Sequence, residues 1–388
     1  MANEFDKNKD QQQDPEQKRD QGQGNMQDPT KKNDQAGAGN GVVDIFDFNG
    51  NLVQRLAAGG PLNSPWGVAL AGGGWGALGG SVLVGNFGDG HINAFDPATG
   101  ALKATLQDST GAPIAIQGLW AIEFGNGGSG GDNSYLYFTA GIINNGAQAG
   151  LLGSIAPQAQ ITGVHNAATG PAPAIAPGEV VQLTGITIGP RPAVSSPSLT
   201  TAVNATTTLG GTTVTINGTP APILYTQADV TNIIVPFGLT GTTASIVVTY
   251  GTTTSQTMTV PLAPTSPGLF PGVAFNQDGT LNTAANPAGA GSVVILYATG
   301  LGQTDPPGQD GVRMGSLVIA EAVATVTATI GGQAATVAYA GSAPGQIAGI
   351  QQVEMIVPAG AGTGLVPVVI TAGGVSPQPG SVQAVYLK

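Results

Sequence analysis

The segment that decides the fold of this chain is residues 83–100, which read LVGNFGDGHINAFDPATG. Short apolar runs in it are separated by Gly-Asp-Gly at 88–90 and by Pro-Ala-Thr-Gly at 97–100, two groups of residues that form tight turns. We therefore interpret the segment as a strand, a turn, a second strand and a hairpin turn, because it lacks helical periodicity. Its Asp, Asn and His residues also make it a candidate metal or ligand loop.

Working outward, this hairpin has an earlier copy. Residues 43–53 read VDIFDFNGNLV, two apolar runs around Asn-Gly, which is the strongest short-range signal of a β-hairpin. Each hairpin is followed by a tryptophan phrase, which contains Trp66 in the first copy and Trp120 in the second. A period near 50 built from short strands predicts blades of a β-propeller over residues 41–155. The segment holds about two to three blades, whereas closed propellers use typically four to eight. The segment is therefore the end of a larger ancestral propeller, or several chains complete one another, or its open edge packs against the next domain.

A second repeat occupies the rest of the chain. INGTPAPILY at 216–225 aligns with IGGQAATVAY at 330–339, and PGEVVQL at 177–183 aligns with AGSVVIL at 290–296. Short strands separated by frequent turns predict two tandem immunoglobulin-like β-sandwiches, at residues 156–264 and 265–388. The predicted fold class is therefore all-β throughout.

Composition limits the range of functions. Charged residues are 9% of the 388 residues, cysteine is absent, and the net charge is −11. Residues 1–40 are rich in Gln, Asp, Lys and Asn and predict a disordered polar tail. The rest of the chain carries five basic and 14 acidic side chains, so the body lacks the basic surface that nucleic acid requires. We expect no membrane span, because no apolar run approaches about 18 residues, and no secretory signal is visible.

Both parts resemble uncharacterised bacterial families. Residues 161–388 resemble a C-terminal domain first described from Solibacter and common in predicted secreted acidobacterial proteins, on the phrases at 176–181, 216–222, 295–304 and 330–335. Residues 41–155 resemble the C-terminal portion of a propeller-like family associated with exported PEP-CTERM systems, on the phrases at 66–69, 83–90, 95–100 and 136–141. The resemblance implies an extracellular or cell-surface location, and it transfers no catalytic residue.

Two segments match the residue pattern of a catalytic or cofactor-binding motif but lack the structural context that the motif requires. Residues 74–79 fit the dinucleotide fingerprint GxGxxG, but a strand follows them where that motif needs a helix. Residues 127–131 fit GxSxG, but glycines surround the serine and the chain has only two histidines. Glu123 is the one acid within an apolar strand, and we expect it to point outward. We therefore expect no catalytic residues.

The candidate ligand-binding residues lie in the propeller-like part. We expect Trp75 to be exposed in a glycine-rich loop, and Asn86, Asp89 and His91 to lie at one mouth of the blades, whereas Trp66 and Trp120 are predicted to be packing residues. No cofactor is predicted apart from calcium, for which the candidate ligands are Asp89, Asp96 and Asp278. The competing interpretation is that these acids form turns.

Three hypotheses follow. The leading one is a non-catalytic extracytoplasmic protein with a structural, adhesive or interaction role. The second is a carbohydrate-binding module that uses the propeller loops, with a polysaccharide or a cell-surface protein as partner. The third is the remnant of a propeller hydrolase, similar to a lactonase. The open propeller edge also predicts oligomerisation.

Overall fold

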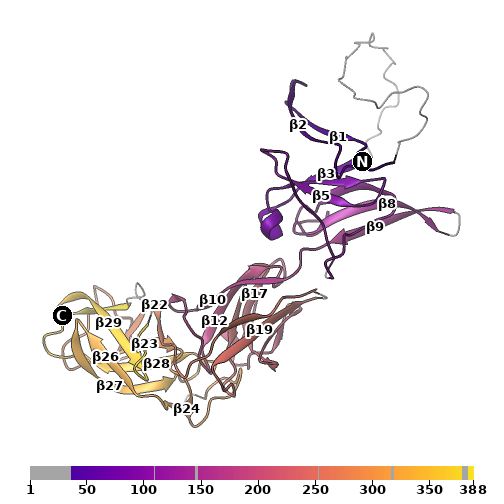
Figure 1. The fold of residues 1–388 in the computed structure, drawn as a ribbon. Helices are drawn as coiled ribbons and strands as arrows, with labels where there is room; N and C mark the ends of the chain where they lie inside the picture. The colour runs from indigo at the N-terminus through magenta and orange to yellow at the C-terminus, as the bar shows by residue number, and fades with distance from the viewer. Residues whose placement is uncertain (1–35, 109, 145–146, 252, 316–318, 378–382) are drawn as a thin grey trace, which may run out of the picture. The chain divides into compact units, whose positions relative to one another are not determined.

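The computed structural model describes residues 36–108, 110–144, 147–251, 253–315, 319–377 and 383–388. Within them the protein is all-β, with short strands and two short 3-10 helices (Figure 1). The chain divides into two compact units. The N-terminal unit comprises residues 1–70, 80–123 and 137–153, and the C-terminal unit comprises the rest. Two loops of the predicted propeller-like segment, 71–79 and 124–136, thus belong to the C-terminal unit.

The strands between residues 42 and 155 form three antiparallel sheets. A two-stranded sheet contains β1 (Val42–Phe46) and β2 (Leu52–Ala58). A four-stranded meander contains β3 (Pro65–Leu70), β4 (Val82–Asn86), β5 (Ile92–Phe95) and β6 (Leu102–Thr105). A three-stranded sheet contains β7 (Leu119–Phe124), β8 (Leu136–Asn144) and β9 (Ala147–Ile155). The 3-10 helix η1 (Gly73–Leu78) lies between β3 and β4 in sequence.

Both predicted hairpins are present, and an aspartate forms each turn. The Asp47 side chain accepts hydrogen bonds from the backbone of Asn49 and Asn51 at 2.9 and 2.8 Å. The Asp96 side chain accepts from the backbone of Ala98 and Thr99 at 3.0 and 2.9 Å. Gly50 and Gly100 follow at φ +83° and +71°, a conformation that favours glycine. The hairpin repeat is therefore a repeat of turn chemistry as well as of sequence.

The backbone next to the two repeated tryptophans also has the same hydrogen bonds and conformation in both repeats. Phe87 N donates to Ser64 O at 2.9 Å, and at the equivalent position of the next repeat Gly141 N donates to Gly118 O at 2.8 Å. Ser64 and Gly118 share a left-handed backbone, with φ of +53° and +65°. The residue directly before β3 and the residue directly before β7 therefore accept the same backbone hydrogen bond in the two repeats.

The end of the predicted tail is held in place. Residues 1–35 lie outside the described residues, but Gly37 N donates to the Asn63 side chain at 2.7 Å and Gly39 N donates to Leu62 O at 2.8 Å. Residue 40 forms a bridge with Asn63. The prediction of disorder up to residue 40 is wrong for these last residues, because the loop before β3 supplies their backbone partners.

The first C-terminal domain is a sandwich of two antiparallel sheets. One sheet contains β10 (Gln160–Asn166), β11 (Gly170–Pro171), β12 (Val180–Ile186), β13 (Val194–Ser195), β17 (Ile223–Gln227) and β18 (Val230–Ile234). The other contains β14 (Thr208–Leu209), β15 (Thr212–Ile216), β16 (Thr219–Pro220), β19 (Thr243–Tyr250), β20 (Thr253–Thr254) and β21 (Met258–Pro261). The helix η2 (Pro197–Leu199) lies between β13 and β14 in sequence. Every second residue of β15 is buried in the core, which contains Leu183, Ile223, Ile233 and Ile246.

The second sandwich repeats this strand order in one continuous nine-stranded sheet. It contains β22 (Gly268–Asn276), β23 (Val293–Thr299), β24 (Thr304–Asp305), β25 (Glu321–Ala322), β26 (Val326–Ile330), β27 (Gln333–Ser342), β28 (Gln351–Ile356), β29 (Gly364–Ala372) and β30 (Gln383–Leu387). Strand β27 pairs with both β26 and β28 and so joins the two faces.

A proline difference explains why only the second sandwich is continuous. At the positions aligned with β27, the first sandwich has Pro220 and Pro222, which lack the N–H of a ladder hydrogen bond. The chain there divides into the short β16 and the separate β17. The hairpin before the break is the same in both domains, since Asn217 and Gly218 match Gly331 and Gly332 in positive φ.

Candidate functional site

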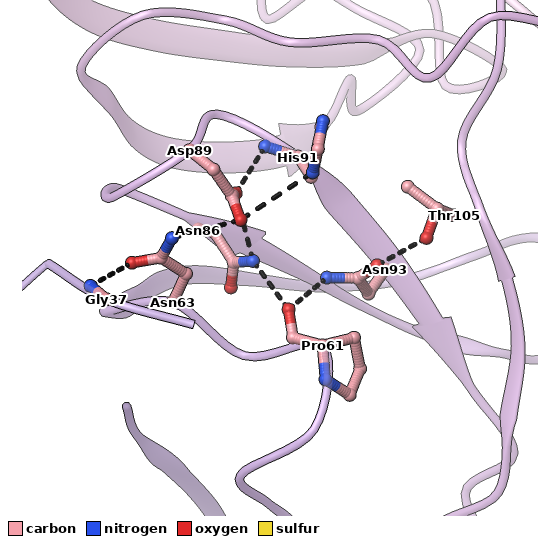
Figure 2. A network of polar contacts seen from close by, with 8 residues as sticks. All are labelled: Gly37, Pro61, Asn63, Asn86, Asp89, His91, Asn93 and Thr105. Atoms are coloured by element: carbon pink, nitrogen blue, oxygen red, sulfur yellow. Dashed lines mark hydrogen bonds and ion pairs between the residues drawn. The ribbon is translucent and has the colours of Figure 1, made fainter. Parts of the chain in front are cut away.

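Three of the predicted ligand-binding residues lie together at the turn between β4 and β5 (Figure 2). Asn86 ends β4, Asp89 lies in the following turn, and His91 immediately precedes β5. Asn86 Nδ2 donates to Asp89 Oδ1 at 3.1 Å, and the His91 backbone N donates to the same oxygen at 3.0 Å. His91 Nδ1 lies 3.6 Å from Asp89 Oδ2. The sequence therefore located a real cluster of polar side chains.

The cluster extends to a loop that the sequence did not indicate. Asn63 Nδ2 donates to Asp89 Oδ2 at 3.1 Å (Figure 2). The carbonyl oxygen of Pro61 accepts from Asn86 Nδ2 at 2.8 Å and from Asn93 Nδ2 at 3.1 Å. Residues 61 and 63 precede β3 and lie far from the turn in sequence, so no local pattern could connect them. The network ties the loop before β3 to the β4–β5 turn.

The geometry around Asp89 favours a structural clamp over a cation site. Its two carboxylate oxygens face N–H donors from Asn63, Asn86 and the His91 backbone. A calcium site requires several oxygen atoms that converge on one point. Around Asp89 the neighbouring groups are N–H donors, whose positive partial charge would repel the cation. Of the four side chains, only those of Asp89 and His91 are appreciably exposed, at 30% and 36%, because Asn86 is fully buried and Asn63 only partly accessible.

Asn86 was predicted to contact a ligand, and its burial contradicts that prediction. Its Oδ1 has no hydrogen-bond partner and is inaccessible to solvent, while its Nδ2 is shared between Pro61 O and Asp89. The Asn86 side chain is therefore buried, and its amide connects Pro61 to the β4–β5 turn at Asp89 rather than facing solvent.

The other two calcium candidates are turn residues. The backbone N–H and hydroxyl of Thr99 hold the pKa of Asp96 below its usual value, and the hydroxyl and backbone N–H of Thr280 do the same for Asp278. In each carboxylate the Oδ1 atom accepts hydrogen bonds from donors within its own turn, which is the role of a turn residue. Over the residues that the structure describes, no group of three or more His, Cys, Asp or Glu side chains could hold a metal ion.

The three tryptophans differ from the predictions in how far they are exposed. Trp75 is only 7% exposed, because its Nε1 donates to Ser134 O at 2.9 Å and its ring meets Phe124 edge-on at 5.3 Å. Trp66 and Trp120 are 51% and 49% exposed, although their rings lie 5.9 Å apart and contact each other. Trp75 therefore packs inside the C-terminal unit, whereas the repeated pair forms an aromatic surface on the N-terminal unit. Glu123 is exposed on β7, as expected.

Phe87 extends this aromatic surface. It follows β4 directly, and its ring stacks on Trp66 with centroids 5.6 Å apart and an interplanar angle of 30°. Because Trp66 and Trp120 come from equivalent repeat positions, their proximity follows from the side-by-side packing of β3 and β7. We call Trp66, Phe87 and Trp120 the aromatic surface.

Sequence reasoning also missed a buried acid in the C-terminal unit. Glu179 is fully buried, its Oε2 accepts from Ala176 N at 2.7 Å, and Ser266 Oγ donates to its Oε1 at 3.5 Å. Burial raises the pKa of Glu179 well above its ordinary value of 4.5. The available signal was an acid directly before the apolar run of β12. Ser266 lies at the start of the second sandwich, just before β22, so Glu179 lies at the junction of the two sandwiches.

Comparisons with known proteins give short sequence matches. No protein-family model matches the chain. Uncharacterized protein R648 of Acanthamoeba polyphaga mimivirus is 39% identical over 119 residues, which are 31% of this chain and 28% of the viral protein. Uncharacterized protein L690 of the same virus is 41% identical over 81 residues, 21% of each chain. The chain thus spans less than a third of the length of these relatives.

The similar solved structures are distant. The extracellular region of plexin A4 aligns with 79% of this chain and 26% of its own, at 9% identity and a TM-score of 0.22. Surface layer protein SbsC aligns with 76% of this chain and 44% of its own, at 13% identity and a TM-score of 0.17. Within the described part of the chain, no helix is long and apolar enough to cross a membrane.

Proposed function

We propose that this is a non-catalytic, extracytoplasmic structural or adhesive protein, in which two immunoglobulin-like sandwiches form one stiff module joined to a propeller-like unit. The hairpin and tryptophan repeats support propeller-like blades, and the two-sheet strand order supports the immunoglobulin-like assignment. The extracytoplasmic location rests on the family resemblance of residues 41–155 and 161–388.

The observation that carries the proposal is the junction between the sandwiches. Val180 N donates to Thr299 Oγ1 at 2.7 Å, and that hydroxyl donates to Gly349 O at 2.9 Å, all in buried surroundings. Asn166 Nδ2 donates to Ser266 O at 2.9 Å nearby. Buried hydrogen bonds of this kind are directional, and breaking one leaves an unpaired polar group, so they oppose bending.

Apolar contacts surround these hydrogen bonds. A buried cluster combines Val180, Leu224 and Ile234 of the first sandwich with Ile347 of the second. A further hydrogen bond joins the two sandwiches, in which Phe237 N donates to Asp310 Oδ1 at 2.7 Å. Adjacent domains in one chain usually move relative to each other unless their interface holds them, so the buried hydrogen bonds and apolar contacts at this junction favour a rigid spacer.

Stiffness is testable because the chain has no native cysteine. Spin labels at Leu199→Cys and Val369→Cys, both exposed and one in each sandwich, measure the distance between the domains by pulsed electron resonance. We expect one narrow distance distribution, and a broad distribution would overturn the stiff module. Absence of catalysis is tested separately by hydrolase and oxidoreductase screens. Turnover abolished by Asp89→Asn or His91→Gln would refute a non-catalytic role.

The aromatic surface supports a second candidate function, carbohydrate binding. Exposed Trp rings stack on sugar rings, and neither Trp66 nor Trp120 uses its indole N–H within the described part of the chain. Glycan-array binding that is lost in Trp120→Ala and retained in Phe48→Ala, an exposed aromatic in the β1–β2 turn, would support it. A silent array with folded protein would exclude it.

A further inference from the structure

The two repeats of the N-terminal unit place Phe87 and Gly141 at equivalent positions. Each residue follows the tryptophan of its own repeat by 21 positions. Each also donates its backbone N–H to the residue two positions before that tryptophan, which is Ser64 in the first repeat and Gly118 in the second. Because spacing and hydrogen bonding agree, side chains at positions 87 and 141 would start from equivalent points of the backbone.

The place beside the tryptophan is filled in the first repeat and left open in the second. The Phe87 ring stacks on Trp66 with centroids 5.6 Å apart. A Cβ at position 141 would have its three nearest atoms in Trp120, with Cε2 and Cζ2 at 3.6 Å and Nε1 at 3.7 Å. A side chain at 141 would therefore lie against the indole ring, but glycine has none. We call the part of the Trp120 ring next to Gly141 the open stacking place.

The backbone does not require glycine at position 141. Gly141 does not have a positive φ, and the contacts of its Cβ would be of ordinary van der Waals length. Gly118 is different, since its φ is +65° and its Cβ would lie 2.2 Å from Gly141 O. The backbone at 141 would thus accept a side chain. The consequence of glycine there is an accessible Trp120, which is 49% exposed.

The chemistry around the open stacking place fits an uncharged sugar. Its rim includes the Trp120 indole N–H, which has no partner within the described part of the chain. A pyranose ring offers C–H groups on its flat face and hydroxyls at its edge, so it can cover the indole and accept from this N–H. The described part of the N-terminal unit has no lysine or arginine besides Arg55 and Lys103, and Arg55 pairs with Asp44 at 2.8 Å. A phosphate or sulfate group would therefore find little positive charge there.

We propose that the open stacking place binds one ring of an uncharged saccharide, held against Trp120 as the Phe87 ring is held against Trp66. The proposal rests on carbohydrate binding, the second candidate function, and it assigns the contact to one place on the aromatic surface. Phe87 occupies the equivalent place in the first repeat, so one chain binds one sugar ring by stacking. Gly141 determines access, because a larger side chain would take the place of the sugar.

The first test fills the open stacking place with a ring of the chain's own. An array of uncharged oligosaccharides identifies a binder, and tryptophan fluorescence then gives its dissociation constant. Gly141→Phe should weaken binding by about tenfold or more, a loss of the size of one aromatic contact. Gly150→Phe is the matched control, because Gly150 is exposed in the same unit with open space around it, and its affinity should equal that of the wild type.

The outcomes separate this proposal from the function on which it rests. If a folded Gly141→Phe variant binds like the wild type while Trp120→Ala loses binding, carbohydrate binding stands and the open stacking place is overturned. An array that stays silent with folded wild-type protein overturns both.

The reverse change gives a second test that does not depend on the folding of Gly141→Phe. Phe87→Gly gives the first repeat the glycine of the second and opens the equivalent place on Trp66. Titration calorimetry with the shortest saccharide that binds should then show two sites per chain instead of one. A folded Phe87→Gly variant that still shows one site overturns the equivalence of the two places, and the proposal with it.

Discussion

Replacing Asp89 tests whether the β4–β5 cluster is a clamp or a cation site. Its carboxylate accepts from Asn63 Nδ2, Asn86 Nδ2 and the His91 backbone at 3.0–3.1 Å. A hydrogen bond to a charged group contributes about 1.5–3 kcal/mol. Asn86 Nδ2 keeps its bond to Pro61 O in the variant, and the Asp89 side chain is 30% exposed, so water replaces part of the loss. We expect Asp89→Ala to lower the unfolding free energy of the N-terminal unit by about 2–3 kcal/mol.

Asp89→Asn separates the contributions of the two carboxylate oxygens. Its amide oxygen can still accept from Asn86 Nδ2 and the His91 backbone, but its NH2 group would face Asn63 Nδ2. The expected loss is about 1 kcal/mol. Asp278→Ala is the control, because that carboxylate is exposed and bonds only to Thr280 among the described residues. Its effect should stay below about 0.5 kcal/mol.

The assay is urea unfolding followed by tryptophan fluorescence, since Trp66 and Trp120 lie in the same compact unit as Asp89. Each variant is measured with millimolar calcium and with chelator. The clamp predicts the same wild-type curve in both conditions. The reasoning is refuted if calcium stabilises the wild type and Asp89→Ala removes that effect, or if Asp89→Ala unfolds like the wild type.

Three further predictions concern the junction and the repeat interface. Burial raises the pKa of Glu179 above 4.5, so the folded state binds more protons than the unfolded state above that pH, and wild-type stability should fall as pH rises from 4.5. The stability of Glu179→Gln relative to wild type, measured by urea unfolding, should therefore be greater at pH 8 than at pH 4; equal differences would contradict this. Thr299→Val leaves Val180 N and Gly349 O unpaired and should cost about 2–4 kcal/mol, whereas the exposed Thr327→Val should change the unfolding midpoint little. Gly118→Ala would place a Cβ 2.2 Å from Gly141 O, so its loss of thermal stability should exceed that of Gly111→Ala, which has a similar positive φ and open space around it.

Local structure was predictable where a short segment supplies its own partners. The hairpins at Asn49-Gly50 and at 97–100 form as expected, because an aspartate and a glycine within each turn satisfy the backbone. The repeats followed for the same reason, and Asp96 and Asp278 proved to be the turn residues that the competing interpretation described. The sequence also placed Asn86, Asp89 and His91 together, because one turn holds all three.

Burial was decided by the tertiary structure. Trp75 looked exposed in a glycine-rich loop, but Phe124 and Ser134, which lie far from it in sequence, enclose it. Trp66 and Trp120 were predicted to be packing residues, and their rings do contact each other, but both side chains remain half exposed.

The sequence by itself determined the all-β class, the turns and both sets of repeats, since periodicity and turn chemistry act between near neighbours. Only the tertiary structure decided that Glu179 is buried at a domain junction and that Val68 on β3 is exposed where Ile122, at the equivalent position of β7, is covered. Those outcomes depend on which distant strand lies opposite each side chain, and two copies of one repeat differ there even where their sequences agree.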